Sequence, residues 1–405
     1  MKSPTRILTG ITTSGTPHLG NYAGAIRPAI AASRNPAAES FYFLADYHAL
    51  VKTGDAARVQ RSTLEIAASW LACGLDPNKV YFYRQSDIPE IPELTWMLTC
   101  VTAKGLLNRA HAYKAATDAN RAADADPDAG ISAGLYMYPV LMAADILIFN
   151  ANKVPVGRDQ IQHIEMARDI GQRFNHVYGE EYFTLPEAAI ENNVATLPGL
   201  DGRKMSKSYD NTIPLWLGAQ ELRRAILSIV TNSLAPGEAK DPDDSNIFSI
   251  YQAFANADDT AAMRQAYADG IGWGDAKQKL FERLDAELAP MREKYETLIA
   301  QPALIEEALR AGALRARSLA TPFLGRLRRA AGLRDLRDVT QAPAATAAAK
   351  TEKPALQPLV YRDAAAFAFK VLDGKREVLA TQGGFADPKS AMAAARAAMD
   401  ALPDA

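Results

Sequence analysis

The stretch Arg6-Ile-Leu-Thr-Gly-Ile-Thr-Thr-Ser-Gly-Thr-Pro-His-Leu-Gly-Asn-Tyr22 joins a short apolar run to a loop and then to a helix. Residues 6–10 carry branched apolar side chains and end on a glycine, a pattern typical of a buried strand in a parallel sheet. Pro17 suits the first position of a helix, where no N–H is needed. Because the N–H groups and positive dipole end of that helix would face the end of the strand, we predict a phosphate-sized anion site there.

Three residues at the start of this helix fit such an anion site. His18 and Asn21 are three positions apart and share a helix face, where both can donate hydrogen bonds to phosphate oxygens. Gly20 has no side chain to block the approach of a ligand. The spacing of Gly10 and Gly15 suits a Walker loop, but threonine and proline stand where its lysine and hydroxyl residue belong. An ordinary strand, turn and helix without a ligand explains this stretch equally well.

Predicted strands and helices alternate through the first half of the chain. Strands are predicted at residues 40–45 and 80–84, and helices at residues 56–73 and 92–108. This alternation predicts an α/β fold, a Rossmann-like doubly wound parallel sheet with right-handed crossovers. His48 follows the strand at residues 40–45, where open sheets bind ligands, so it is a candidate to line the site. A packed or capping histidine is an equal alternative.

The length, charge and cysteine content of the chain limit the kinds of protein that it can be. The chain has 405 residues, 48% of them hydrophobic and 23% charged, which suits a globular protein of two or three domains. A net charge of −2 offers no global attraction to nucleic acid, so RNA contacts must depend on local basic patches. Cys73, Cys100 and five scattered histidines give no zinc-binding pattern, so we expect reduced thiols and no structural metal. Because no segment suits a signal peptide or a membrane helix, we expect a cytoplasmic protein.

A single carboxylate, Asp145, stands inside the predicted apolar helix at residues 136–149. Burial of an ionised carboxylate costs several kcal/mol unless hydrogen-bond donors compensate for it. Asp145 therefore either pairs with a protein donor or waits for the N–H group of a ligand. Composition alone favours an arginine partner.

The next segment brings further polar groups to the same edge of the sheet. Residues 153–174 predict a β-branched strand, a glycine turn and a long amphipathic helix. Gly157, Arg158 and Asp159 would lie at the strand end and helix start, facing the same crevice as the first loop. Gln160 would place an amide donor and acceptor in that crevice.

A second cationic motif follows at residues 204–208, which have the sequence Lys-Met-Ser-Lys-Ser. Lys204, Lys207 and the two hydroxyl groups form a concentrated clamp for an anion. Gly199 and Gly202 precede the motif and predict a mobile loop. A solvated basic loop is the alternative.

The pattern of the whole chain predicts four parts, three of which follow residue 215. We expect a catalytic domain at residues 1–215, a helical domain at 216–340, a flexible linker at 341–358 and a small ββα domain at 359–405. In the small domain the strands are predicted at 367–372 and 377–381, and the helix at 388–402. Arginines gather near the end of the helical domain and predict either an RNA-backbone patch or a solvated helix face. They are Arg310, Arg315, Arg317, Arg326, Arg328, Arg329, Arg334 and Arg337.

Two motifs resemble the signatures of class I aminoacyl-tRNA synthetases. His18-Leu19-Gly20-Asn21 resembles their His-Ile-Gly-His sequence, and residues 204–208 match their Lys-Met-Ser-Lys-Ser loop letter for letter. Within that class, residues 138–145 (Tyr-Pro-Val-Leu-Met-Ala-Ala-Asp) and 154–163 (Val-Pro-Val-Gly-Arg-Asp-Gln-Ile-Gln-His) are similar to bacterial tryptophanyl-tRNA synthetases. The resemblance covers residues 7–336. The remaining C-terminal extension resembles the short ββα repeat of YegP-like proteins.

This resemblance implies a tryptophan–tRNA ligase that uses ATP and Mg²⁺. It implies that Asp145 accepts the indole N–H, that Met142 packs on the ring, and that Tyr138 and Gln160 hold the amino group. Its partners would be L-tryptophan, tRNA(Trp) bound by the helical domain, and a second copy of the chain in a homodimer.

The resemblance also implies which residues act on ATP. Catalytic roles would belong to His18, Asn21, Lys204 and Lys207, with Mg²⁺ bridging phosphate oxygens and no protein metal ligands. The residues that would bind ATP are Thr12, Thr13, Ser14, Gly20, Asn21, Gly157, Arg158, Asp159, Leu197, Lys204, Met205, Ser206, Lys207 and Ser208.

The chain departs from the pattern of the family at three places. Thr12-Thr13 replaces a frequent Gln-Pro, His18 replaces a common threonine, and Ala116 stands where some relatives have a second lysine after Lys114. The first change leaves the contact of that glutamine unassigned. Two rival functions are a tyrosyl-type synthetase, which carries other residues at both blocks, and a non-catalytic paralogue that binds tryptophan or RNA.

Overall fold

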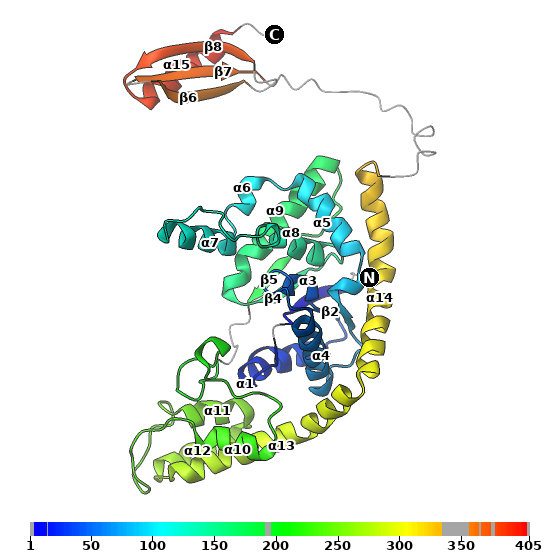
Figure 1. Cartoon of the computed structure of the whole chain (residues 1–405), viewed down its shortest axis with the longest axis vertical. Coiled ribbons are helices and arrows are strands. Elements are labelled where there is room, and N and C mark those ends of the chain that lie inside the picture. The colour runs from blue at the N-terminus through cyan, green and yellow to red at the C-terminus, as the bar shows by residue number, and fades with distance from the viewer. Residues whose placement is uncertain are drawn as a thin grey trace. The chain divides into compact units, whose positions relative to one another are not determined.

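The computed structural model describes residues 4–13, 15–190, 196–333, 356–363, 366–373 and 377–402. The chain forms two compact units, Met1–Leu333 and Arg334–Ala405 (Figure 1). Among the described residues, every helix is too short or too polar to cross a membrane.

The first unit is built around a parallel sheet of five strands. The strands are β1 (Thr5–Ile11), β2 (Ala38–Leu44), β3 (Tyr81–Arg84), β4 (Lys153–Val156) and β5 (Glu187–Ile190). Their order across the sheet is β3-β2-β1-β4-β5, as Figure 1 shows in part. The order reverses between β1 and β4, and ligands of doubly wound sheets bind where the order reverses. The predicted α/β fold with a doubly wound parallel sheet is confirmed.

Helices cover both faces of the sheet because successive strand residues point to opposite sides. In β2, Tyr42 and Leu44 join one apolar core, and Phe41 and Phe43 join the other. The first core contains the continuous segment α1 (Leu19–Asn21), η1 (Tyr22–Ile26) and α2 (Arg27–Ala32), together with α4 (Ala56–Ala72). The second contains α5 (Glu90–Val101), α8 (Ala133–Leu147) and α9 (Ile161–Tyr178).

Three short helices lie between these elements: α3 (Asp46–Ala49), α6 (Lys104–Leu107) and α7 (His111–Ala122). The helix predicted at residues 92–108 is therefore two helices, because Thr102 has extended backbone angles. The adjacent β-branched pair Val101-Thr102 has low helix propensity, which is consistent with a break there. The first helix also begins later than predicted, since His18 is its N-cap and Pro17 lies outside it.

The helices after the sheet are α10 (Ala219–Leu227), α11 (Asn246–Phe254), α12 (Ala257–Ala268), α13 (Trp273–Ala300) and α14 (Pro302–Ala330). Helices α10 to α13 share the first core of the sheet, and the second half of α14 enters the other core. Helix α14 packs along β3, the edge strand. The predicted division at residues 215 and 216 stays a prediction.

The second unit is an antiparallel sheet of order β6-β7-β8 with one helix. Its elements are β6 (Gln357–Asp363), β7 (Ala366–Leu372), β8 (Val378–Phe385) and α15 (Pro388–Ala401), around Phe369, Val371 and Ala395. The prediction of two strands was wrong, because β6 is a third. Residues 341–355 of the predicted linker lie outside the described residues, but Gln357 and Pro358 already belong to β6. Pro358 is compatible with a strand because β6 is at the edge of the sheet.

Candidate active site

The loop after β1 contains a buried hydroxyl group without a partner. Thr12 is exposed, whereas Thr13 is 3% exposed. Within the described part of the chain, Thr13 Oγ1 has no hydrogen-bond partner. Buried polar atoms of this kind are rare in proteins and often mark a ligand contact. Ser14 lies outside the described residues.

His18 and Asn21 hold each other at the start of α1. The His18 N–H donates to Asn21 Oδ1 at 3.1 Å, and the Asn21 N–H donates to His18 Nδ1 at 3.3 Å. Burial and the nearby Lys207 ammonium lower the pKa of His18 to about 4. The ring is therefore neutral at pH 7, and because Nδ1 accepts, its one proton is on Nε2. His18 can thus donate a hydrogen bond to an anion through Nε2.

The expected anion site at the helix start is partly occupied by the protein itself. The Leu19 N–H donates to the Ile213 carbonyl at 3.0 Å, and the Asn21 N–H is used by His18. These two groups are therefore not available to a phosphate in this structure. The donors that the sequence predicted remain on the side chains of His18 and Asn21.

Residues 197–211 form a loop that Asn211 holds together. The buried amide of Asn211 donates to Asp201 Oδ1 at 2.6 Å and to the Lys204 carbonyl at 3.1 Å. Its Oδ1 accepts from the Ser206 N–H at 2.8 Å. Two of these three bonds fix the backbone of the predicted anion clamp, and the third holds the Asp201 side chain.

This loop packs against the first motif. Met205 is buried, and its N–H donates to the Leu197 carbonyl at 2.9 Å. A Cβ atom placed on Gly20 would lie 3.6 Å from Met205 Sδ, and one placed on Gly15 would lie 3.4 Å from Lys207 Nζ. The two signature motifs, far apart in sequence, therefore meet beside the end of β1. Burial lowers the pKa of Lys207.

Asp145 is fully buried and has two protein donors. His48 Nε2 lies 2.9 Å from Asp145 Oδ2, and Gln85 Nε2 donates to Oδ1 at 2.8 Å and to Oδ2 at 3.0 Å. The Tyr47 N–H donates to Gln85 Oε1 at 3.1 Å, which fixes the orientation of that amide. No arginine is needed to compensate for the burial of Asp145. His48 and Asp145, both predicted from the sequence, thus lie together.

Tyr138 and Gln160 are joined through a third side chain, His163. The Tyr138 hydroxyl lies 2.6 Å from His163 Nε2, and Gln160 Oε1 lies 2.9 Å from His163 Nδ1. The rings of His48 and Tyr138 are edge to face, with centroids 6.3 Å apart. A continuous polar cluster therefore reaches from Asp145 to Gln160.

The remaining predicted residues flank these clusters. Met142, on α8, is partly buried against the second core, and Gly157 is the N-cap of a short 3-10 turn, η3 (Arg158–Gln160). The side chain of Asp159 lies outside the described residues. Lys204, Ser208 and Arg158 are exposed. Their roles in binding stay predictions.

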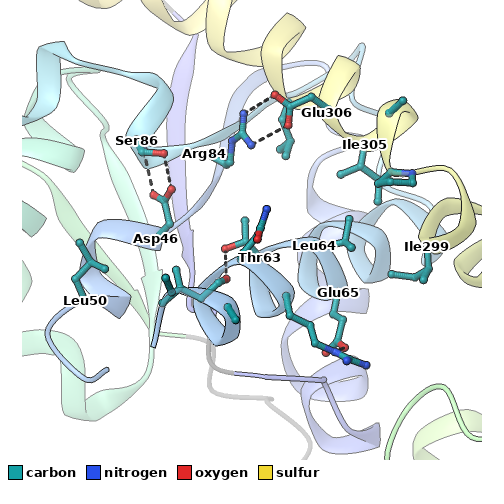
Figure 2. Close-up of a pocket in the computed structure, with 18 of the residues that line it drawn as sticks. Asp46, Leu50, Thr63, Leu64, Glu65, Arg84, Ser86, Ile299, Ile305 and Glu306 are labelled. Carbon is teal, nitrogen blue, oxygen red and sulfur yellow. Dashed lines mark hydrogen bonds and ion pairs between the residues drawn. The ribbon is translucent and has the colours of Figure 1, made fainter. Parts of the chain in front are cut away.

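A cavity of about 1130 Å³ lies between α4, the end of β3 and the junction of α13 with α14. Figure 2 shows that its polar residues pair with one another: Ser86 with Asp46, and Arg84 with Glu306. This cavity was not predictable from the sequence, because its walls come from four separate segments.

Comparison with known proteins identifies the family. A family model described as class I tRNA synthetases (W and Y) matches residues 1–289. The tryptophan–tRNA ligase of Xanthomonas campestris pv. campestris is 64% identical over 393 residues, which are 96% of this chain and 91% of that protein. The corresponding ligase of Pseudomonas putida is 63% identical over 395 residues, 97% of this chain and 88% of the relative. The chain belongs to the tryptophanyl-tRNA synthetases.

A solved structure of the same family supports the fold assignment. The tryptophanyl-tRNA synthetase of Campylobacter jejuni, complexed with ADP and tryptophan, is 42% identical and superposes with a TM-score of 0.74. The match covers 81% of this chain and 100% of that chain. Since these relatives are all tryptophan enzymes, they favour a tryptophanyl-tRNA synthetase over the tyrosyl alternative.

Three residues of the site were missed by the sequence reasoning. Gln85 directly follows a predicted strand, as His48 does, and that position was a usable signal. His163 ends the second family block but was given no role. Asn211 carried no signal, since its importance depends on how the loop folds back.

The arginines of α14 differ in what they contact. Arg315 and Arg317 are partly buried against the sheet region and Glu90, so for these two the solvated face was wrong, and the RNA-backbone patch stays a prediction. Arg315 donates to the Val80 carbonyl at 2.7 Å, and ion pairs join Arg317 to Glu90, Arg326 to Glu180 and Arg328 to Glu93. Arg310 pairs with Glu306 on its own helix, and Arg329 is exposed. Arg334 and Arg337 lie outside the described residues.

Proposed function

We propose that the chain activates L-tryptophan with ATP to tryptophanyl-adenylate and pyrophosphate, and then transfers tryptophan to the 3′ end of tRNA(Trp). The observation that carries this proposal is the buried carboxylate of Asp145. A carboxylate accepts about four hydrogen bonds, and His48 and Gln85 make three contacts with this one. One position is left for the indole N–H, a group that only donates.

The rest of the amino-acid site follows from the cluster around Asp145. Met142 packs on the indole ring, His48 lines the site, and Tyr138 and Gln160 hold the α-ammonium group. A ligand with no donor at the indole position leaves Asp145 with an unused buried acceptor, which weakens its binding.

ATP binds where the two signature motifs meet. The partnerless hydroxyl of Thr13 and the side-chain-free positions Gly15 and Gly20 fit a nucleotide phosphate group that approaches closely. The contacts come from Thr12, Thr13, Ser14, Gly20, Asn21, Gly157, Arg158, Asp159, Leu197, Lys204, Met205, Ser206, Lys207 and Ser208.

The reaction needs positioning and charge stabilisation, and no general base. The carboxylate of tryptophan is ionised at neutral pH, and one of its oxygens forms a bond to the α-phosphorus of ATP. The bond from that phosphorus to the bridging oxygen breaks, and the electron pair leaves with pyrophosphate. His18 Nε2–H, Asn21, Lys204 and Lys207 stabilise the charge that develops on the phosphates.

Mg²⁺ adds positive charge at the phosphate oxygens when it is bound. Among the described residues, no group of three or more histidine, cysteine or acidic side chains could hold a metal ion. Such a group is not required, because Mg²⁺ would keep several waters and would be held mainly by substrate phosphates with at most one or two carboxylates.

In the second step, a hydroxyl of the terminal ribose of tRNA attacks the carbonyl carbon of the adenylate, and AMP leaves. Residues 216–340 bind the tRNA, and the enzyme works in the cytoplasm as a homodimer. Trp96 on α5, 69% exposed, is an apolar side chain suited to the dimer surface.

Lys204→Ala tests the anion clamp. We expect a loss of roughly a hundredfold or more in adenylate formation, with the dissociation constant for tryptophan nearly unchanged. The control is Lys79→Ala, an exposed lysine that pairs only weakly with Asp76, at 3.6 Å. An equal loss of tryptophan binding would contradict the transition-state role. A folded wild-type protein that forms no adenylate with Mg²⁺ present would favour the non-catalytic paralogue.

A further inference from the structure

The helix that begins at His18 continues through a π-turn, η1 (Tyr22–Ile26), before it becomes α2. The Arg27 N–H donates to the Tyr22 carbonyl, which is five residues back, whereas an α-helix joins residues four apart. Such wide turns are rare and often lie at functional sites. This one begins directly after Asn21, so its geometry determines how the first turn of the helix is oriented.

One carboxylate, that of Glu287 on α13, binds the side chains at both ends of this π-turn. The Tyr22 hydroxyl donates to Glu287 Oε1 at 2.9 Å, and the Arg27 guanidinium lies 3.4 Å from the same oxygen. Residues five apart do not share a face of an α-helix, whereas in a π-turn they are one turn apart. The π-turn is therefore what allows Tyr22 and Arg27 to reach the same carboxylate.

The hydrogen bond from Tyr22 to Glu287 has a fixed direction. Tyr22 is buried in the first core, and its burial, together with the charge of the Glu287 carboxylate, raises the pKa of the phenol. The phenol therefore keeps its proton at neutral pH and donates it to the carboxylate. Because a hydroxyl bond to a carboxylate is charge-assisted, it is stronger than a bond between neutral groups.

Two arginines hold Glu287 in place and also bind the end of α11. Arg283 donates to Glu287 Oε2 at 2.6 Å and to the Phe254 carbonyl at 2.7 Å. Arg27 donates to the Ala253 carbonyl at 2.6 Å. These carbonyls belong to the last two residues of α11, where the helix itself provides no partner. The carboxylate therefore has a fixed place relative to α11 and α13, and its contacts with Tyr22 and Arg27 fix the π-turn there as well.

We propose that Glu287 is a positioning residue that holds the π-turn and thereby places the side chains of His18 and Asn21 for adenylate formation. This inference rests on the proposed function, which assigns phosphate contacts to His18 and Asn21. The Tyr22 N–H donates to the His18 carbonyl at 3.1 Å, so a shift of Tyr22 moves the start of the helix with it. Without the carboxylate the π-turn relaxes towards an α-helix, and the residues before it rotate relative to α2 by up to roughly 100°, the angle of one helical residue.

The test measures single-turnover adenylate formation and the dissociation constant for tryptophan on the full-length protein with Mg²⁺. We expect Glu287→Ala to slow adenylate formation about tenfold or more, because small displacements of catalytic groups are costly. Tryptophan affinity should change less than about twofold, since Asp145 is held by His48 and Gln85. The control is Glu296→Ala, an exposed position of α13, which should leave both quantities unchanged.

Two milder variants make the result specific to the contact between Tyr22 and Glu287. Tyr22→Phe removes the hydroxyl but keeps the ring that stacks on Phe254, and it should also slow adenylate formation with tryptophan affinity unchanged. Glu287→Gln keeps an oxygen that can accept from Tyr22, so it should retain more activity than Glu287→Ala. If Glu287→Ala fails to fold, Tyr22→Phe still decides through the same difference between rate and affinity.

Wild-type rates in Glu287→Ala and Tyr22→Phe would overturn the inference. An equal loss of adenylate formation and tryptophan affinity would also overturn it, since it would indicate a general structural role. His18→Ala separates this failure from a failure of the proposed function. If His18→Ala slows adenylate formation and the Glu287 variants do not, only the inference fails. If His18→Ala forms the adenylate at the wild-type rate, the assignment of phosphate contacts to His18 fails with it.

Discussion

Asp145 has no exposed surface, and two neighbouring side chains compensate for its burial. Burial raises the pKa of its carboxyl, and the hydrogen bonds from His48 and Gln85 offset only part of that rise. Because the Tyr47 N–H fixes the Gln85 amide, Asp145 receives a donor whose direction cannot reverse. The carboxylate is thus held ready for one more N–H group.

Asp145→Ala should therefore weaken tryptophan far more than an analogue without the ring N–H. We expect a loss of about tenfold to a hundredfold for tryptophan, because a hydrogen bond to a charged group is removed. The benzothiophene analogue of tryptophan keeps the ring shape and serves as the matched ligand in calorimetric titrations. Equal weakening of both ligands would exclude Asp145 from contact with the indole.

The lowered pKa of His18 predicts how the stability of the fold depends on pH. Its pKa is about 4 in the folded protein and 6.5 in an unfolded chain, so between these values the unfolded chain binds more protons. Stability that is present above pH 6.5 is therefore lost as the pH falls towards 4. In urea unfolding at pH 7 and pH 4.5, His18→Gln should lose less stability on acidification than the wild type. Parallel losses in the two proteins would contradict the lowered pKa.

At the scale of single residues, the sequence predicts which side chains are candidates for the site better than it predicts which residues they contact. Asp145 stood out because one carboxylate interrupted an apolar helix, and His48 because it followed a strand. Gln85 follows a strand as His48 does and could have been found by the same signal, whereas His163 could not be assigned, since its role depends on the distance between α8 and α9. The pairing of Asp145 with protein donors is confirmed, and its contact with a ligand stays a prediction.

In the loop at residues 197–211, Gly199 was expected to make the chain mobile. The structure shows a different reason for the glycine, which is close packing. A Cβ atom on Gly199 would lie 2.4 Å from the Asn211 side chain and 2.6 Å from its carbonyl oxygen. The glycine therefore allows close packing against the residue that holds the loop together. The sequence predicted the cationic residues of this loop, but its internal hydrogen bonds required the structure.

Gly199→Ala should displace Asn211 and loosen the anion clamp. We expect adenylate formation in a single-turnover assay to slow about tenfold or more, because small displacements at a catalytic site are costly. Tryptophan affinity should change little. Gly105→Ala is the control, since a Cβ atom there would meet nothing within 4 Å. Wild-type rates in both variants would contradict the role given to Asn211.

At the scale of the first unit, α14 closes the edge of the sheet. Arg315 donates to the Val80 carbonyl beside β3, and Arg317 and Thr321 both bind the buried Glu90. Edge strands need such cover because their unpaired backbone groups can otherwise join another chain. The helix that seemed suited to RNA by composition is thus fixed to the sheet along one side.

Gly312→Ala should push α14 away from β3. The added Cβ would lie 1.8 Å from the Phe82 carbonyl oxygen, a clash with backbone that no side chain can relieve. We expect a loss of at least about 1–3 kcal/mol in the free energy of unfolding, measured by urea titration. Gly325→Ala on the same helix meets its nearest atom at 3.9 Å and should be neutral or stabilising. Similar stabilities for the two variants would contradict the close packing.

Two features at this scale could not be read from the sequence. Counting arginines could not reveal Glu90, Glu93 and Glu180, which lie on other elements and pair with arginines of α14. The third strand of the C-terminal unit was hidden because Pro358 and the half-exposed pattern of β6 are typical of linkers as well as of edge strands. The doubly wound sheet was predictable, since alternating strands and helices permit few other arrangements.

The most direct test is amino-acid-dependent exchange of pyrophosphate into ATP, measured with tryptophan, tyrosine and phenylalanine side by side. The account predicts exchange with tryptophan alone, because only its indole N–H completes the contacts of Asp145. Exchange with tyrosine, or none with any of the three in folded protein with Mg²⁺, would contradict it.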